Sequence, residues 1–72
     1  MERPQYKLNK LNGRIVEMCG TRREFAKRMK IGEGTISKKL NNEAPFTQYE
    51  ISRATEILEI SLDEIGVYFF TK

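Results

Sequence analysis

Two short helical patterns on either side of a turn dominate residues 21–42. The first pattern places apolar residues at three- and four-residue steps, and the second places Ile36 and Leu40 one helical turn apart. Residues 30–32, which include Gly32, separate the two patterns. Two short helices joined by a tight Gly-containing turn are typical of a helix-turn-helix. This stretch therefore predicts an α-helical fold built around such a pair.

The first of these helices has a local start signal. Thr21 and Glu24 predict a capping box, in which the Thr21 hydroxyl accepts a hydrogen bond from the Glu24 amide and the Glu24 carboxylate accepts one from the Thr21 amide. The helix should therefore begin at Arg22. Its inward face is predicted to consist of Phe25, Ala26 and Met29.

The second helix of the pair is predicted to begin after Gly32 and to end at Asn41 and Asn42. Ile36 and Leu40 give it a narrow inward face. The other side chains are expected outside, namely Glu33, Thr35, Ser37, Lys38 and Lys39.

Further helices are predicted before and after the pair. Leu8, Leu11 and Ile15 recur at helical spacing in a helix that should end at Gly20. Two more capping boxes follow the pair, Thr47 with Glu50 and Ser61 with Glu64. The first should open a helix of about eleven residues. The second should open a short last helix, in which Leu62 and Ile65 are expected to close the core.

The ends of the chain lack these patterns. Residues 1–72 are predicted to form a single domain, in which residues 1–5 are a flexible basic arm and residues 67–72 an apolar tail. Four successive apolar residues, 67–70, cannot all face one side of a helix end. Either the tail folds back under the first helix and completes the core, or it contacts another protein.

Several residues of the motif carry a family resemblance. They are Ala26, the apolar turn residue Ile31, Thr35-Ile36-Ser37 and Asn41-Asn42. With them the chain resembles the lambda-repressor-like Cro/repressor (XRE-type) helix-turn-helix family. Residues 45–51 look like the small Cro-like switch proteins of phages that infect Gram-positive bacteria, and the whole chain is similar to their Mor-type modulators of repression. The resemblance implies an all-α domain of five helices, with the helix-turn-helix at helices 2 and 3.

Charge is distributed unevenly along the chain. Residues 1–40 contain eleven Lys or Arg and four Asp or Glu, a net charge of +7, whereas residues 41–72 contain two and six, a net charge of −4. The basic half contains the helix-turn-helix, so its charge is predicted to face DNA phosphates. The alternative is that the chain is highly charged only because this keeps it dissolved.

The composition argues against an enzyme, a cofactor or a metal. His is absent, which excludes a His-based zinc site or nucleophile relay. A single cysteine, Cys19, excludes an internal disulfide. The sequence contains no apolar run of signal-peptide or membrane length. We therefore expect a non-enzymatic cytoplasmic protein with no cofactor and no membrane contact, and the resemblance to phage proteins implies that this is the cytoplasm of the host bacterial cell.

The resemblance implies which residues bind a partner. In the family, bases are contacted from the start of the first motif helix and from the first turn of the second. The candidate residues for binding DNA or a repressor are Arg22, Arg23, Lys27, Glu33, Gly34, Thr35, Ser37, Lys38 and Asn41. Glu33 and Gly34 are poorly suited to DNA, because a carboxylate repels phosphates and glycine has no side chain to present to a base.

Two functions remain open from the sequence. In one, the chain is a regulator of the phage lysis/lysogeny switch that acts with, or by binding to, the phage repressor, as an antirepressor or modulator of repression. In the other, it is a stand-alone Cro-like repressor that binds operator DNA as a homodimer, because one short helix contacts only a half-site. Glu33 and Gly34 favour the first function, and the net charge of the basic half favours the second.

Overall fold

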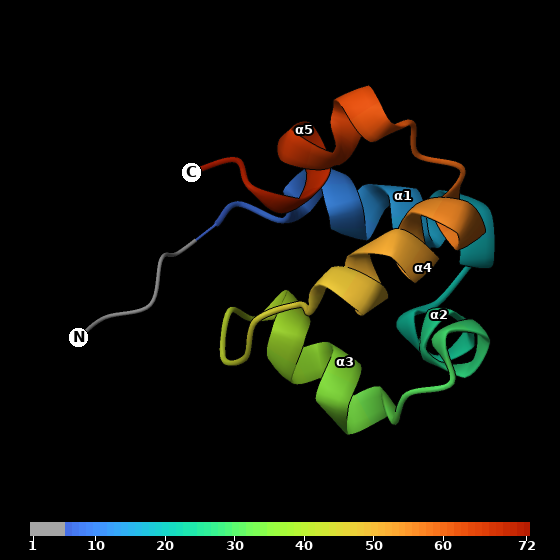
Figure 1. Ribbon diagram of the computed structural model, residues 1–72. Coiled ribbons are helices and arrows are strands. Elements are labelled where there is room, and N and C mark those ends of the chain that lie inside the picture. Colours follow the sequence, from blue (N-terminus) through green and yellow to red (C-terminus); the bar gives the residue numbers. More distant parts are fainter. Residues whose placement is uncertain (1–5) are drawn as a thin grey trace.

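The computed structural model describes residues 6–72, and the arm predicted at residues 1–5 lies outside the described residues. Residues 6–72 form five α-helices and one 3₁₀ helix, without a strand. These are α1 (Asn9–Cys19), α2 (Arg22–Met29), α3 (Glu33–Leu40), α4 (Gln48–Leu58), the 3₁₀ helix η1 (Leu62–Glu64) and α5 (Ile65–Phe69). The predicted all-α fold with five helices is confirmed. Figure 1 shows α1 and α4 between α5 at one end of the molecule and α2 and α3 at the other.

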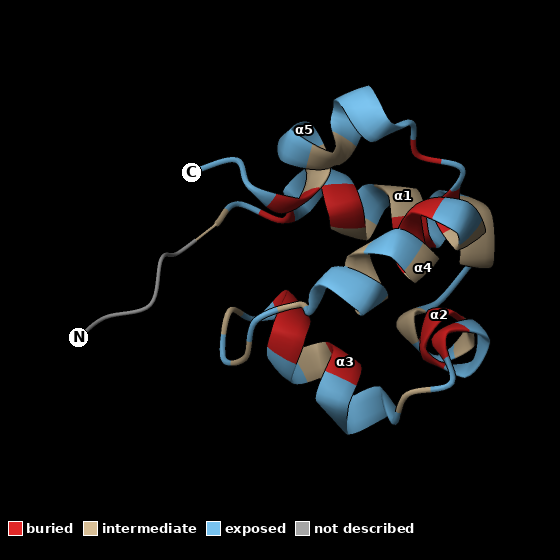
Figure 2. Ribbon diagram, viewed as in Figure 1, coloured by how far each residue is buried: buried red, intermediate tan, exposed pale blue. Residues whose placement is uncertain are grey.

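The core is a single apolar cluster to which every α-helix contributes. Its members are Leu8, Leu11, Ile15, Phe25, Ala26, Met29, Ile36, Leu40, Ala54, Leu58, Ile60 and Phe69. Figure 2 shows the buried residues on the helix sides that face one another. The inward faces predicted for α1, α2 and α3 from apolar spacing are therefore confirmed. No helix among residues 6–72 has both the length and the apolar character needed to cross a membrane.

The predicted capping boxes differ in how completely they form. Before α4, the Thr47 hydroxyl accepts a hydrogen bond from the Glu50 amide at 3.1 Å, and a Glu50 carboxylate oxygen accepts one from the Thr47 amide at 2.8 Å. Before α2, the Thr21 hydroxyl accepts from the Glu24 amide at 3.1 Å. The return bond predicted there is replaced, because the Glu24 carboxylate pairs with Arg28 Nε at 3.0 Å, one helical turn further on.

The third box opens η1, and here one prediction is wrong. The Glu64 carboxylate accepts from the Ser61 hydroxyl at 3.0 Å and from its amide at 3.4 Å. Leu62 does not close the core, however, because its side chain is 83% exposed. Ile60, just before the box, is 6% exposed and fills the inward position instead, which leaves Leu62 on the outer side of the tight 3₁₀ turn.

Lys39 was expected outside α3, and this prediction is also wrong. Lys39 is only 8% exposed, and its Nζ donates to a Glu50 carboxylate oxygen at 2.7 Å and to the Pro45 carbonyl at 2.9 Å. Lys39 lies beside the inward residue Leu40, so its aliphatic stem packs while its ammonium reaches α4. Glu50 thus caps α4 and anchors α3 with the same carboxylate.

The apolar tail is divided between the two predicted alternatives. Phe69 is 3% exposed and completes the core, whereas Val67 and Phe70 are 42% and 49% exposed. The tail lies against the start of the described chain, because the Lys7 amide donates to the Thr71 carbonyl at 2.6 Å. The alternative in which the tail completes the core therefore holds for Phe69 and in part for Tyr68, which packs against the core. A contact of Val67 and Phe70 with another protein stays a prediction.

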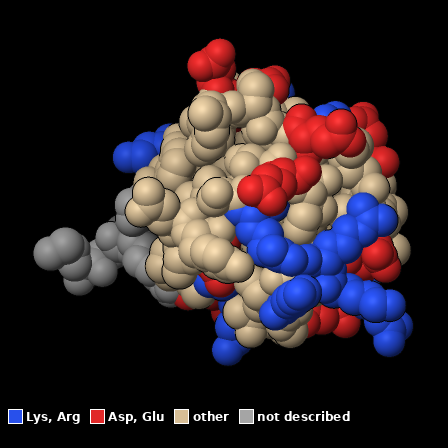
Figure 3. All heavy atoms as spheres, turned by 45° about the vertical axis from the view of Figure 1, so that its right-hand side comes forward, with Lys and Arg blue, Asp and Glu red and all other residues tan. Residues whose placement is uncertain are grey.

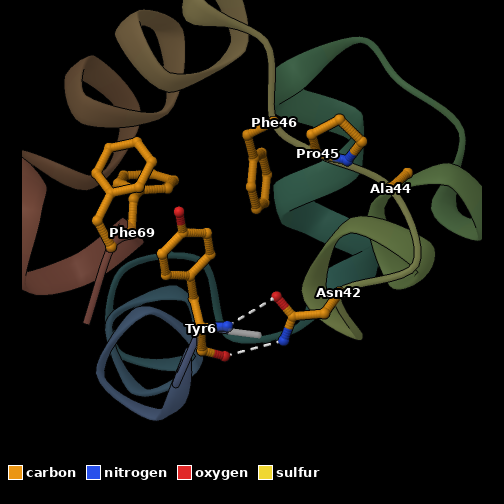
Figure 4. A pocket seen from close by; sticks show the side chains of 7 residues that line it. Tyr6, Asn42, Ala44, Pro45, Phe46 and Phe69 are labelled. Carbon is orange, nitrogen blue, oxygen red and sulfur yellow. Dashed lines mark hydrogen bonds between the residues drawn. The ribbon is translucent and has the colours of Figure 1, made fainter. Parts of the chain in front are cut away.

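Asn42 joins the loop after α3 to the segment before α1. Its side-chain oxygen accepts from the Tyr6 amide at 3.2 Å, and its side-chain nitrogen donates to the Tyr6 carbonyl at 2.9 Å. Figure 4 shows both bonds at the edge of a cavity of about 250 Å³ that is lined mainly by aromatic rings. Asn42 has a φ of +62°, a left-handed conformation that asparagine tolerates better than most residues. A single side chain therefore fixes two segments that are far apart in the sequence.

The ion pair between Lys39 and Glu50 predicts a large loss of stability when only one partner is removed. In Glu50→Gln the Lys39 ammonium stays buried without a carboxylate, so we expect the free energy of unfolding to fall by about 3 kcal/mol. Adding Lys39→Met removes the buried charge and should restore most of the loss. Urea unfolding of the two single variants and the double variant measures this coupling. Independent, additive effects of the two substitutions would contradict it.

The same pair predicts an acid-sensitive component of stability. Burial alone would raise the pKa of Glu50, but the hydrogen bonds from Lys39 and Thr47 and the Lys39 charge outweigh it and lower the pKa below its ordinary value. The contribution of Glu50 should therefore be complete above the pKa of unfolded glutamate, about 4.3, and disappear as the pH falls through the lower folded value. Urea unfolding from pH 7 to pH 3 should show a smaller decline for Lys39→Met/Glu50→Gln than for the wild type.

Candidate functional site

The charged side chains of α2 fall into two groups. Arg28 is committed to Glu24 in the ion pair within the helix. Arg22, Arg23 and Lys27 form no ion pair with any described residue. Arg23 and Lys27 are exposed, and Arg22 is half-buried. The three predicted cations of α2 are thus available to a partner.

The outer face of α3 is formed by Gly34, Lys38 and Asn41. Each residue advances the helix by about 100°, which places these three opposite the buried Ile36 and Leu40. All three are exposed, and Asn41 lies just after the last helical residue. This face therefore presents the Lys38 ammonium and the Asn41 side-chain amide to a partner. Gly34, nearer the start of the helix, adds no side chain to it.

The other candidate residues of α3 lie on its two flanks. Glu33 and Ser37 share one flank, where Glu33 is exposed and Ser37 is half-buried. Thr35 is exposed and lies on the opposite flank, toward Lys39. The predicted residues of α3 are therefore not all on one face, and a flat partner contacting Gly34 and Lys38 would meet Glu33 and Thr35 at its edges.

A shallow groove brings the two helices of the candidate site together. It has a volume of about 500 Å³ and is lined by Thr21, Arg23, Glu24, Ala26, Lys27, Ile31 and Glu33. Arg23, Lys27 and Glu33, all predicted site residues, share this groove. Glu33 makes no ion pair with any residue in the described part of the chain. Glu33 lies in the first turn of α3, where Gly32 supplies no capping side chain. A negative charge at that position also interacts favourably with the helix dipole.

One cation of this region was missed by the sequence prediction. Lys30 ends α2 in a left-handed conformation, with a φ of +61°, and its side chain is exposed. It lies in the turn between the two motif helices, next to the groove residue Ile31. The one sequence signal for Lys30 is that a charged residue occupies a turn position where glycine is often found. We call the nine predicted residues together with Lys30 the α2–α3 surface.

Figure 3 shows how charge is distributed over one face of the molecule. Lys and Arg side chains gather across its lower right part, and Asp and Glu side chains are concentrated above them. On this face the cations and most of the carboxylates therefore occupy different regions, although a few carboxylates lie among the cations.

Comparison with known proteins places the chain in a family. The family model described as "Protein of unknown function (DUF739)" matches residues 5–72. The chain belongs to this family. No curated protein matches this DUF739 chain.

A solved structure is similar to this DUF739 chain over most of its length. It is the solution structure of the modulator of repression (MOR) of the temperate bacteriophage TP901-1 from Lactococcus lactis. The sequences are 40% identical, the TM-score is 0.81, and the match covers 90% of this chain and 88% of that chain. The resemblance to Mor-type proteins that was inferred from the sequence is thereby confirmed.

Gly34 offers a direct test of the outer face of α3. A Cβ built at this position meets nothing within 4 Å, and Gly34 has an ordinary helical backbone. We expect Gly34→Ala to raise the free energy of unfolding by about 0.5–1 kcal/mol, because alanine loses less conformational entropy in a helix. Gly13→Ala in α1, where the added Cβ also meets nothing, is the matched control and should stabilise to a similar degree. Urea unfolding measures the free energy of unfolding of both variants. Destabilisation by Gly34→Ala but not by Gly13→Ala would contradict the conclusion that the space beside Gly34 is open.

Proposed function

We propose that this chain is a small regulator of a phage lysis/lysogeny switch that acts with, or by binding to, the phage repressor through its α2–α3 surface. The observation that carries the proposal is the 40% identity to the modulator of repression of TP901-1 across 90% of this chain. Similarity of this extent in a chain of 72 residues includes the segments that form the α2–α3 surface. The chain would therefore be an antirepressor or modulator of repression.

The electrostatics of the groove support a protein partner. Glu33 is exposed and has no ion pair with a described residue, although Arg23 and Lys27 line the same groove. A carboxylate at this position repels DNA phosphates but can pair with the Lys and Arg side chains of another DNA-binding surface. A repressor presents such a basic surface because it must contact phosphates.

A second candidate function is supported by the cations of the same surface. Arg22, Arg23, Lys27, Lys30 and Lys38 form no ion pair with any of residues 6–72. Five unpaired cations suit contacts with a phosphate backbone. In this alternative the chain is a Cro-like repressor that binds operator DNA as a dimer, with Thr35, Ser37 and Glu33 at the base edges.

Fluorescence anisotropy of labelled operator DNA distinguishes the two functions. The DNA is titrated with this protein, with the cognate repressor, and with both, over a series of salt concentrations. The proposal expects weak binding by this protein alone and a clear change in the operator affinity of the repressor when both are present. Tight operator-specific binding by this protein alone, with the steep salt dependence of several phosphate contacts, would instead support the Cro-like alternative.

Glu33 variants test the role of the groove in the same assay. Glu33→Lys should weaken the effect on the repressor, because it replaces attraction by repulsion, and Glu33→Gln should have an intermediate effect. Glu17→Lys makes the same change of charge on α1 and disrupts only a surface ion pair with Arg14, so it serves as the control. An equal loss in Glu17→Lys and Glu33→Lys would show that net charge, and not the groove, is responsible.

A further inference from the structure

A second cavity adjoins the α2–α3 surface, between the turn that follows α2 and the start of α4. Its volume is about 310 Å³, and it is lined by Met29, Lys30, Ile31, Thr47, Tyr49, Glu50 and Arg53. We call it the turn cavity. Ile31 also lines the groove that contains Glu33. The cavity and the groove therefore meet at the turn, and a partner that covers the turn lies over both.

Tyr49 is a large side chain of this cavity that the fold does not use. It lies in the first turn of α4 and is 72% exposed. It belongs neither to the core nor to the apolar residues packed against the core, and its ring pairs with no other ring in residues 6–72. Tyrosine is enriched among the residues that contribute most to protein interfaces, because its rigid ring supplies a large contact area. Tyr49 is therefore suited to anchor a partner.

Two cations line the turn cavity without a counter-ion. Lys30 and Arg53 form no ion pair with any described residue. The Arg53 guanidinium has five N–H donors, but it makes one hydrogen bond within residues 6–72, to the Arg28 carbonyl at 3.3 Å. Its Nε is buried without an acceptor among these residues. The Glu50 carboxylate does not neutralise the two cations, because it is paired with Lys39 at 2.7 Å. The cavity therefore presents positive charge.

The charge changes sign from the cavity to the groove on the other side of Ile31. The groove contains Glu33, which has no ion pair with a described residue, together with Arg23 and Lys27. A DNA backbone presents only phosphates, so it would be attracted by the cations of the cavity and repelled by Glu33. A protein can instead place an acidic side chain at the cavity and a basic one at Glu33. The pattern around the turn therefore favours a protein partner.

We infer that the turn cavity is part of the repressor contact of the α2–α3 surface, with Tyr49 as an aromatic anchor and with Lys30 and Arg53 as the binding site for an acidic side chain of the repressor. The inference rests on the proposed function and deepens it. Glu33 receives a basic side chain of the repressor, and the cavity adds a second contact of opposite charge. A repressor must match both charges at once, so the two contacts together discriminate between repressors.

A charge series at Lys30 tests the acidic contact. Isothermal titration calorimetry measures the affinity of each variant for the full-length cognate repressor without DNA, so that no nucleic-acid phosphate takes part. Lys30→Arg should bind nearly as well as the wild type, Lys30→Gln more weakly, and Lys30→Glu at least about tenfold more weakly than the wild type. Lys10→Glu is the matched control, because Lys10 is exposed on α1, has no ion pair with a described residue and does not line the cavity. Its affinity should stay within about twofold of the wild type.

Tyr49→Ala tests the aromatic anchor in the same titration. We expect it to weaken repressor binding about fivefold or more, because truncation of a central aromatic residue is costly at protein interfaces. Gln48→Ala is the control, since Gln48 is the exposed neighbour of Tyr49 in the first turn of α4 and does not line the cavity. Urea unfolding should give nearly the same midpoint for all of these variants, because each altered side chain is exposed.

The outcomes separate the inference from the proposed function. Wild-type affinity for the repressor in Lys30→Glu and Tyr49→Ala, together with a loss in Glu33→Lys, overturns the inference and leaves the proposed function intact. The inference is also overturned if Lys30→Glu keeps its affinity for the repressor and loses affinity for operator DNA, because the cavity then contacts a phosphate. If the wild-type protein neither binds the repressor nor changes its operator affinity, the proposed function fails and the inference fails with it.

Discussion

The ion pair between Lys39 and Glu50 fixes the geometry of the α2–α3 surface. One carboxylate oxygen of Glu50 receives both the Lys39 ammonium at 2.7 Å and the Thr47 amide at 2.8 Å, so the position of α3 and the start of α4 depend on the same atom. The Pro45 carbonyl, in the loop between these helices, accepts a second bond from Lys39. A buried pair of this kind contributes little net stability but strongly disfavours arrangements that separate its partners. It therefore specifies how α3 is presented more than how stable the chain is.

The same pair shows why the net charge of the basic half overstates the charge available to a ligand. Lys39 pairs with Glu50, Arg28 with Glu24, and Arg14 caps the carbonyl end of α4 while pairing with Glu17. These cations serve the fold. Five of the cations left for a partner lie on α2, on α3 and in the turn between them, and Lys7 and Lys10 flank the start of α1. The charge available to a partner is therefore smaller than the sequence sum suggests. On the α2–α3 surface, the negative charge of Glu33 has a large effect on the local electrostatic potential.

Most predictions that depend on neighbouring residues were correct, apart from the return bond of the Thr21 box and the burial of Leu62, whereas contacts between distant residues were missed. The Thr47 box and the apolar spacing of α2 involve groups within one or two turns, and both were correct. The burial of Lys39 depends on Glu50, eleven residues away, and the role of Asn42 depends on Tyr6, thirty-six residues away. Neither contact has a local signature. The candidate site was predictable in its helices, and the division of α3 into a face and two flanks follows from helical periodicity around the buried Ile36 and Leu40.

The exposure of Leu62 shows that apolar spacing can also mislead within a single turn. Apolar spacing predicted an inward Leu62, and the structure gives the inward position to Ile60 instead. A chain of 72 residues has a small core, and the exposed Leu62 is apolar surface that this core does not use, whereas the half-exposed Phe70 packs edge-on against the Tyr6 ring, with 5.5 Å between the ring centres. Glu56, Glu59 and Asp63, which are near Leu62 in the sequence, are exposed as well, whereas the unpaired cations Arg22, Arg23, Lys27, Lys30 and Lys38 lie on α2, on α3 and in the turn between them.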